Sequence, residues 1–131
     1  MIVQFNWLAV LVAAVSAFAI GGLWYGPLFQ HAWCREAGID LHANKRHPAK
    51  VFGTAFVAAL VGAIAFAWWV GPAPGLEYAV RHGVLAGFGI AATSFGINYA
   101  FAGRSLKLWL IDGGYHTLQF AVYGMILGLW H

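Results

Sequence analysis

The sequence predicts an all-α integral membrane protein, folded as an antiparallel bundle of four transmembrane helices joined by short loops. Of its 131 residues, 62% are hydrophobic and only 8% are charged, whereas a soluble domain carries about 25% charged residues. Because so few charges cannot cover a surface that faces water, lipid is the expected solvent. Four apolar runs also reach the roughly 20 residues that a helix needs to cross a bilayer. We expect one membrane domain that covers residues 1–131.

The four expected helices are separated by residues that interrupt helical structure. Pro27 would disrupt a continuation of the first helix. The second helix is expected to stop at Gly71-Pro72-Ala73-Pro74-Gly75, and the third at Gly103. The first charged residue is Arg35, so the opening run lacks the basic start of a signal peptide and is expected to be a membrane helix. The expected helices cover about residues 4–26, 49–70, 78–102 and 105–130.

The basic residues are divided unevenly between the two sides of the membrane. The first and third connections hold Arg35, Lys45, Arg46, Lys50, Arg104 and Lys107. The opposite side has only Arg81. Because cytoplasmic loops are enriched in Lys and Arg, connections one and three are predicted to be cytoplasmic, with both termini outside a plasma or inner membrane. These basic residues are expected to contact lipid headgroups, and no nucleic-acid partner is expected.

The first connection, about residues 30–48, is the only sizeable polar segment. Trp33 stands where an interfacial aromatic residue is expected, and Glu36, Asp40 and His42 follow it. Two interpretations of this segment remain open. It forms either a short helix on the membrane surface or a plain loop of the positive-inside type.

No metal site or cofactor is expected. His31 and Cys34 form an H-x2-C pair, and His42 and His47 follow, but these spacings match no familiar zinc signature. Cys34 is the only cysteine, which excludes an internal disulfide. The chain also contains no nucleotide-binding loop, nucleophile elbow or haem-attachment motif.

Small residues recur at four-residue spacing on each expected helix, in the pattern that lets helix backbones approach closely in lipid. The stripes are Ala9, Ala13, Ala17 and Gly21; Ala55, Ala59, Ala63 and Ala67; Gly83 and Gly87; and Gly124 and Gly128. They predict a tight bundle, with one stripe available for a partner subunit. Four helices present more small faces than a single chain needs, so at least one of Gly87 and Gly128 is expected to face lipid.

The most informative polar residue is Asp112, because a carboxylate at the centre of a membrane helix costs about 2.5–3.5 kcal/mol. His116 follows at i+4 on the same face, so its ring is expected to donate a hydrogen bond to Asp112. Tyr115, Gln119 and Tyr123 continue that face.

Depth in the membrane adds Asn98, Trp24 and Tyr25 to the same layer as Asp112, in the cytoplasmic half of the bundle. One interpretation is a cluster that accepts a proton or binds a ligand. The other is a hydrogen-bond knot that holds helices one, three and four together, with about 0.6 kcal/mol from each bond. The candidate polar cluster is therefore Asp112, His116, Asn98, Tyr25, Trp24, Tyr115 and Gln119.

Three sequence patterns resemble the signatures of a family of small membrane proteins, domain of unknown function 1761. The opening signature is Gly22-Leu23-Trp24-Tyr25-Gly26-Pro27-Leu28-Phe29 followed by Trp33. Residues 98–101 (NYAF) and 110–116 (LIDGGYH) fit later signatures. The resemblance implies a four-helix bacterial membrane protein, and it implies no activity because the family has none assigned.

Three functions are compatible with these observations. The leading expectation is a non-enzymatic structural or accessory subunit that contacts the lipid bilayer and either self-associates or joins a larger membrane complex. The alternative is a small transporter or channel whose Asp112–His116 pair binds a proton or a small solute. An enzyme that uses His116 as a base is not expected, because no second catalytic group stands out.

Overall fold

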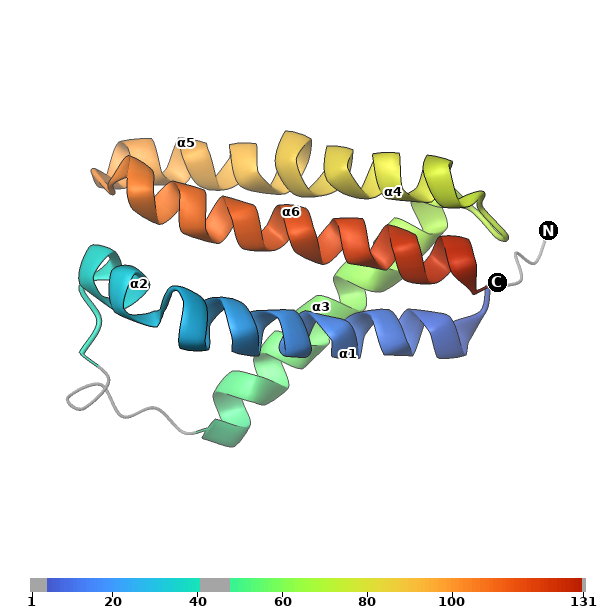
Figure 1. Cartoon of the computed structure of the whole chain (residues 1–131), viewed down its shortest axis with the longest axis horizontal. Coiled ribbons are helices and arrows are strands. Elements are labelled where there is room, and N and C mark those ends of the chain that lie inside the picture. Colours follow the sequence, from blue (N-terminus) through green and yellow to red (C-terminus); the bar gives the residue numbers. More distant parts are fainter. Residues whose placement is uncertain (1–4, 41–47, 131) are drawn as a thin grey trace.

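A computed structural model of the chain describes residues 5–40 and 48–130 (Figure 1). These residues form helices and turns, and this part of the chain contains no strand. The elements are α1 (Trp7–Leu23), η1 (Trp24–Leu28), α2 (Gln30–Ala37), α3 (Pro48–Val70), α4 (Leu76–Val84), η2 (Leu85–Ala92), α5 (Thr93–Ala102) and α6 (Leu106–Leu129). The prediction of an all-helical fold is confirmed for the described residues. The expectations for His42, Lys45, Arg46 and His47 lie outside them.

Three helical segments are long and apolar enough to cross a membrane. They are Trp7–Leu28, Pro48–Val70 and Leu76–Ala102, and their ends differ from the expected ranges by no more than a few residues. α6 has 24 residues, but Asp112, His116 and Gln119 make it less apolar than the other three. The three apolar segments suggest association with a membrane.

Local side-chain chemistry explains where several helices begin and end. The side chain of Asn6 accepts a hydrogen bond from the backbone N–H of Ala9, 3.1 Å away, and so caps the start of α1. Ser105 caps α6 in the same way. α2 and α5 end at Gly38 and Gly103, whose φ values of 70° and 69° favour glycine.

The first span does not end at Gly26, as predicted, but continues through the kinked segment η1. Gly26 adopts φ −98° and ψ −107° there, and Pro27 follows it. The chain then resumes as α2, so residues 30–37 of this connection form a short helix, whereas a position of that helix on the membrane surface stays a prediction. A π-helical segment, η2, lies inside the third span. Such segments often occur at functional sites.

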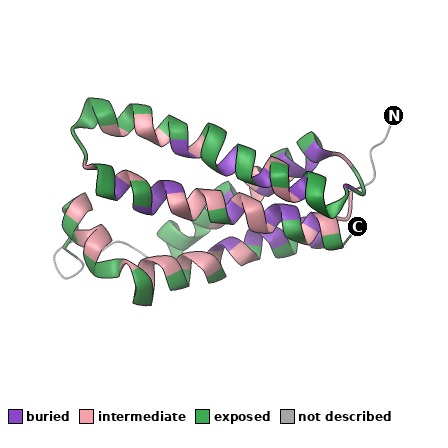
Figure 2. Cartoon of the chain, turned by 45° about the horizontal axis from the view of Figure 1, so that its top comes forward, coloured by how far each residue is buried: buried purple, intermediate pink, exposed green. Residues whose placement is uncertain are grey.

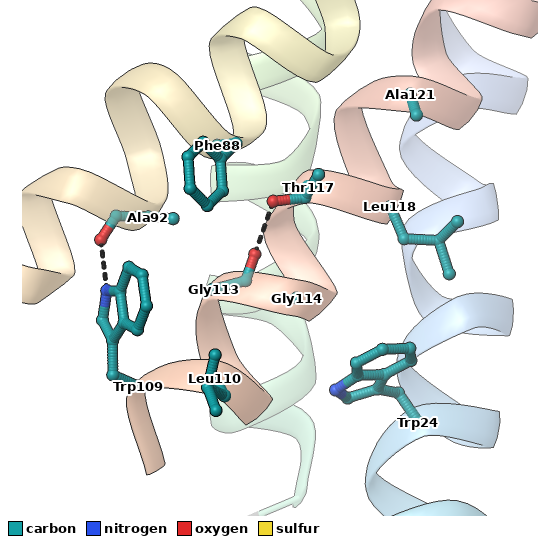
Figure 3. A pocket seen from close by; sticks show the side chains of 10 residues that line it. All are labelled: Trp24, Phe88, Ala92, Trp109, Leu110, Gly113, Gly114, Thr117, Leu118 and Ala121. Carbon is teal, nitrogen blue, oxygen red and sulfur yellow. Dashed lines mark hydrogen bonds between the residues drawn. The ribbon is translucent and has the colours of Figure 1, made fainter. Parts of the chain in front are cut away.

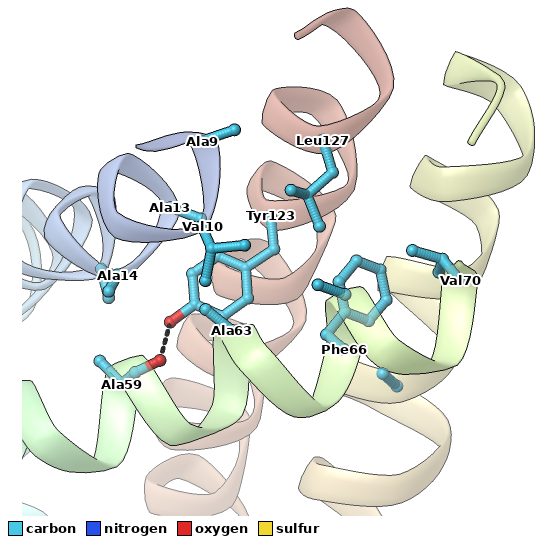
Figure 4. Close-up of a cluster of buried hydrophobic side chains, with 13 residues drawn as sticks. Ala9, Val10, Ala13, Ala14, Ala59, Ala63, Phe66, Val70, Tyr123 and Leu127 are labelled. Atoms are coloured by element: carbon cyan, nitrogen blue, oxygen red, sulfur yellow. Dashed lines mark hydrogen bonds between the residues drawn. The ribbon is translucent and has the colours of Figure 1, made fainter. Parts of the chain in front are cut away.

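The alanine stripes of α1 and α3 lie in the apolar core, except for Ala55, which is exposed. Ala9, Ala13 and Ala63 are fully buried, and their small side chains bring the two helices close together (Figure 4). Tyr123 of α6 is also fully buried and lies among these alanines. Buried residues concentrate in the half of the molecule that holds the start of α1 and the end of α6 (Figure 2). The first eight residues of α3, 48–55, are all exposed, so α3 joins the core only through its later turns.

The glycine pairs lie in the contact between α6 and the α4–η2 segment. A Cβ at Gly87 would lie 2.5 Å from the His116 carbonyl oxygen, and one at Gly128 would lie 2.7 Å from the Leu76 Cα. The expectation that at least one of these two glycines faces lipid is therefore wrong. Each helix contributes one glycine pair to the same contact, because both backbones must lack a Cβ to approach so closely.

Gly83 and Gly124 belong to that contact as well. A Cβ at Gly83 would overlap the backbone of Phe120, and one at Gly124 would overlap the backbone of Ala79. Gly21 differs from them, since a Cβ there would make an ordinary 3.5 Å contact with the Tyr115 ring. Four of the five packing glycines are thus required for a backbone approach.

Candidate functional site

Asp112 accepts hydrogen bonds from two tyrosines that come from other elements. The hydroxyl of Tyr25 in η1 lies 2.5 Å from Oδ1, and the hydroxyl of Tyr99 in α5 lies 2.5 Å from Oδ2. The side chain is 8% exposed. Each oxygen of the carboxyl group thus has one tyrosine hydroxyl as its partner. The site therefore joins η1, α5 and α6 through one acidic group.

Tyr99, which the sequence analysis did not select, takes the place expected for Asn98. Asn98 is exposed, so its prediction as a partner of Asp112 is wrong. Successive helical residues point about 100° apart, so only one of these neighbours can face α6. Phe95 lies four residues before Tyr99, and its ring centroid is 5.6 Å from that of Tyr99. The Phe95 ring also stacks on His116 of α6, with the two centroids 5.1 Å apart, so the face of α5 that holds Phe95 and Tyr99 is the one directed at α6.

His116 does not bond to Asp112, as the i, i+4 spacing predicted, but to Gln119. Its Nδ1 lies 2.6 Å from Gln119 Oε1. Asp112 is instead engaged by the hydroxyls of Tyr25 and Tyr99. His116 is engaged by Gln119 and by the Phe95 ring stacked on it.

The bond to Gln119 belongs to a chain of hydrogen bonds that ends on α3. Gln119 Nε2 donates to the Tyr123 hydroxyl at 2.8 Å, and that hydroxyl donates to the Ala59 carbonyl at 3.0 Å (Figure 4). A carbonyl can only accept, so the direction of each bond follows from this end. His116 must then carry a hydrogen on Nδ1. The predicted polar face of α6 is thus two separate networks.

Two more predicted residues connect the first helix to α6 through backbone carbonyls. Trp24 Nε1 donates to the carbonyl of Ile111 at 2.8 Å, and the Tyr115 hydroxyl donates to the carbonyl of Ala17 at 2.9 Å. Trp24 reaches α6 from η1, so this kinked segment positions it together with Tyr25. These bonds are structural links and leave Asp112 as the acidic centre.

Asp112 also lines a polar pocket of about 360 Å³. The pocket lies between α2 and the start of α6, and its walls are Trp33, Ala37, Gly38, Ile39, Tyr99, Arg104, Leu108 and Asp112. Asp112 is buried, whereas Arg104 is exposed and donates from Nη1 to the Ala37 carbonyl at 3.1 Å. The pocket therefore has an acidic group at its buried end and a basic group at its exposed end.

Next to this pocket, α2 is attached to α6 by Ser105 and Glu36. The Ser105 hydroxyl donates to Glu36 Oε1 at 2.6 Å. This bond holds the pKa of Glu36 below its usual value, with a smaller contribution from the charge of Arg35. The contact fixes the C-terminal end of α2 beside the start of α6.

A second pocket, of about 420 Å³, is apolar and lies between η2 and α6 (Figure 3). Trp109 and Trp24 stand on two of its sides, and Trp109 Nε1 donates to the carbonyl of Ala92 at 2.7 Å. Its lining of aromatic and small residues suits a lipid chain and offers no charged group. The pocket at Asp112 is therefore the candidate for polar chemistry.

The described residues, 5–40 and 48–130, contain no group of three His, Cys, Asp or Glu side chains placed to hold a metal ion. His31 and Cys34 lie on α2. Their expected companions His42 and His47 lie outside the described part of the chain.

The comparison with known proteins identifies a family that the chain matches. The model of a family described as protein of unknown function (DUF1761) matches residues 8–128. No curated protein and no solved structure matches the chain. The match covers all elements of the Asp112 site.

Proposed function

We propose that this chain, which belongs to the DUF1761 family of proteins of unknown function, is a small multi-pass membrane transporter or channel that binds a small cationic solute at Asp112. The observation that carries this proposal is the position of Asp112, a buried carboxylate that lines a polar pocket. A charged side chain inside a membrane is costly and usually serves a pathway or a binding site. A hydrogen-bond network that only held the helices together would need no pocket beside it.

The proposed topology has four antiparallel spans, with α6 as the fourth, in a plasma or inner membrane. The side chain of Asn6 donates to the backbone carbonyl of Trp130 at 3.4 Å, which supports termini on the same side. Arg35 and Arg104 lie at the other end, beside the polar pocket. The positive-inside rule then puts the pocket toward the cytoplasm and both termini outside.

We propose that the protein is not an enzyme. Asp112 is engaged by two tyrosine hydroxyls, and His116 is engaged by the Gln119 amide. The two groups belong to different networks, so neither one activates the other in the way that a base activates a hydrogen-bonded nucleophile.

Binding of organic amines tests this function directly. The purified protein in detergent would be heated with a panel of small primary amines, and a ligand at 100 times its Kd should add about 2.7 kcal/mol of stability. We expect at least one amine to raise the melting temperature of the parent and not of Asp112→Asn. The same amine should cross the membrane of proteoliposomes that contain the parent. If no amine stabilises the parent more than Asp112→Asn, the proposal is wrong.

A structural or accessory role is the second candidate, and a groove between α1 and α3 favours it. The groove has a volume of about 430 Å³ and includes the small residues Ala17, Gly21, Gly22, Ala55 and Ala59. Small residues of this kind allow a helix of a second copy or of another subunit to approach. The groove opens where the first turns of α3 are exposed.

Gly22→Leu tests this second role. A Cβ at Gly22 would meet no described atom within 4 Å, so the chain should fold while its groove is filled. A smaller particle in native mass spectrometry, or the loss of a co-purifying subunit, would support an interface. Gly53→Leu is the matched control, because Gly53 is equally open and does not line the groove. Equal particles for all three proteins would exclude this groove as the interface.

A further inference from the structure

We propose that the Asp112 pocket selects a small zwitterion, a molecule with an ammonium group at one end and a phosphate or carboxylate at the other, over a simple cation. This inference rests on the proposed function and names its class of ligand. It follows from the opposite charges of Asp112 and Arg104 in the lining of one pocket.

The buried end of the pocket suits an ammonium group. Each carboxylate oxygen of Asp112 accepts one tyrosine hydroxyl and still has a further acceptor site. Trp33 contributes its indole ring to the same pocket, and indole is the strongest aromatic partner for a cation. The C-terminal end of α2, at Ala37 and Gly38, adds the partial negative charge of a helix terminus.

The exposed end of the pocket suits an anion. Arg104 uses one of its five N–H donors for the carbonyl of Ala37, so most of its guanidinium remains available for a phosphate or carboxylate. Arg104, Leu108 and Asp112 are spaced four residues apart and line one pocket. Arg104 lies in the turn before α6, and the helical residues from Leu106 to Asp112 alone rise about 9 Å, a span that the two charged side chains shorten.

The two charges also discriminate against ligands with one charge. A simple cation gains from Asp112 but must pass Arg104, and a simple anion gains from Arg104 but is repelled by Asp112. A zwitterion satisfies both groups. Each charge-assisted contact that is lost should weaken binding about tenfold or more.

A free solute and a lipid headgroup can both supply this chemistry. Free phosphoethanolamine carries an ammonium and a phosphate, and phosphatidylethanolamine carries the same groups. The acidic end of the pocket is the buried one, so the ammonium must enter first. This order favours a free molecule, since the phosphate of a lipid is held at the membrane and its ammonium points to water.

The binding experiment compares phosphoethanolamine with its two halves, ethanolamine and methyl phosphate, by calorimetry on the detergent-purified protein. We expect phosphoethanolamine to bind the parent at least about tenfold more tightly than either half. Arg104→Gln should bind phosphoethanolamine and ethanolamine equally, and Asp112→Asn should bind phosphoethanolamine no more tightly than the parent binds methyl phosphate. Lys107→Gln is the matched control, because it removes a nearby positive charge that does not line the pocket.

A second arm identifies the source of the ligand. The protein in nanodiscs of phosphatidylcholine would be compared with the protein in nanodiscs that also contain phosphatidylethanolamine. If only the latter lipid raises the melting temperature, and does so through Arg104 and Asp112, the zwitterion comes from the membrane and the inference stands.

Two results would overturn the inference, and they separate it from the proposed function. Equal binding of ethanolamine and phosphoethanolamine by the parent would leave a cation site and remove the role of Arg104. If no probe binds, in detergent or in either nanodisc, the proposal of a zwitterion site is refuted. The proposal of a cation site is tested separately by the panel of amines.

Discussion

Removal of the tyrosine hydroxyls at Asp112 is the sharpest test of the site. Tyr25→Phe and Tyr99→Phe each delete one 2.5 Å hydrogen bond to the buried carboxylate and leave the ring in place. Hydrogen bonds to charged groups contribute about 1.5–3 kcal/mol in soluble proteins, and side-chain bonds in membranes average about 0.6 kcal/mol. Because Asp112 is 8% exposed, little water replaces the lost donor. We expect each variant to lose about 1–3 kcal/mol of stability.

The assay is reversible unfolding in mixed detergent, with Asn98→Leu as the matched control. Asn98 precedes Tyr99 on α5 but is exposed, so its replacement should change stability by less than about 0.5 kcal/mol. In an Asp112→Asn background, the cost of both tyrosine changes should fall, because the charge they stabilise is absent. The reasoning is refuted if Asn98→Leu costs as much as Tyr99→Phe, or if the tyrosine costs are the same in both backgrounds.

Three further predictions concern packing, pH and topology. Gly87→Ala should lower the stability of the fold by about 1–3 kcal/mol through overpacking, because its Cβ would lie 2.5 Å from a backbone oxygen. Gly22→Ala should not lower the stability, and thermal unfolding of the two variants compares them. Ser105→Ala should lose about 1 kcal/mol of capping and raise the pKa of Glu36 toward its usual value. Since that pKa is lowered in the folded state, its stabilisation is present above the unfolded pKa and lost as pH falls through the folded pKa, so unfolding of the variant should depend less on acidic pH. Cys34 should react with an impermeant maleimide only after cells are opened, and labelling of intact cells would reverse the topology.

The helix positions could be predicted from the sequence because their determinants are local. Apolar runs, the glycines at 38 and 103 and the cap at Ser105 act within a few residues. The glycine pairs also predicted close packing correctly. Their partner could not be predicted, because stripes with the same spacing occur on each helix and fit one another equally well.

The site was only partly predictable, because it depends on helix rotation and on side-chain direction. Polarity favoured Asn98 over Tyr99, but the rotation of α5 turns Tyr99 toward α6 and leaves Asn98 exposed. The spacing of Asp112 and His116 allowed a hydrogen bond between them, but Asp112 bonds to tyrosines of two other elements and His116 bonds to Gln119. The polar pocket itself requires α2 to fold back beside α6, which follows from the kink at Gly26 and from contacts distant in sequence.

The unequal packing of the two halves constrains how any solute could cross the membrane. At one end, Asp112 lines a pocket with an exposed rim. Toward the other end, Tyr123 is fully buried among the alanines of α1 and α3, and its hydroxyl bonds to the Ala59 carbonyl (Figure 4). A solute that moves from Asp112 toward that end meets the packed core around Tyr123. We expect transport through a single chain to move α3 relative to α6 and to break the bond between Tyr123 and Ala59, and the exposed first turns of α3 leave space for such a movement.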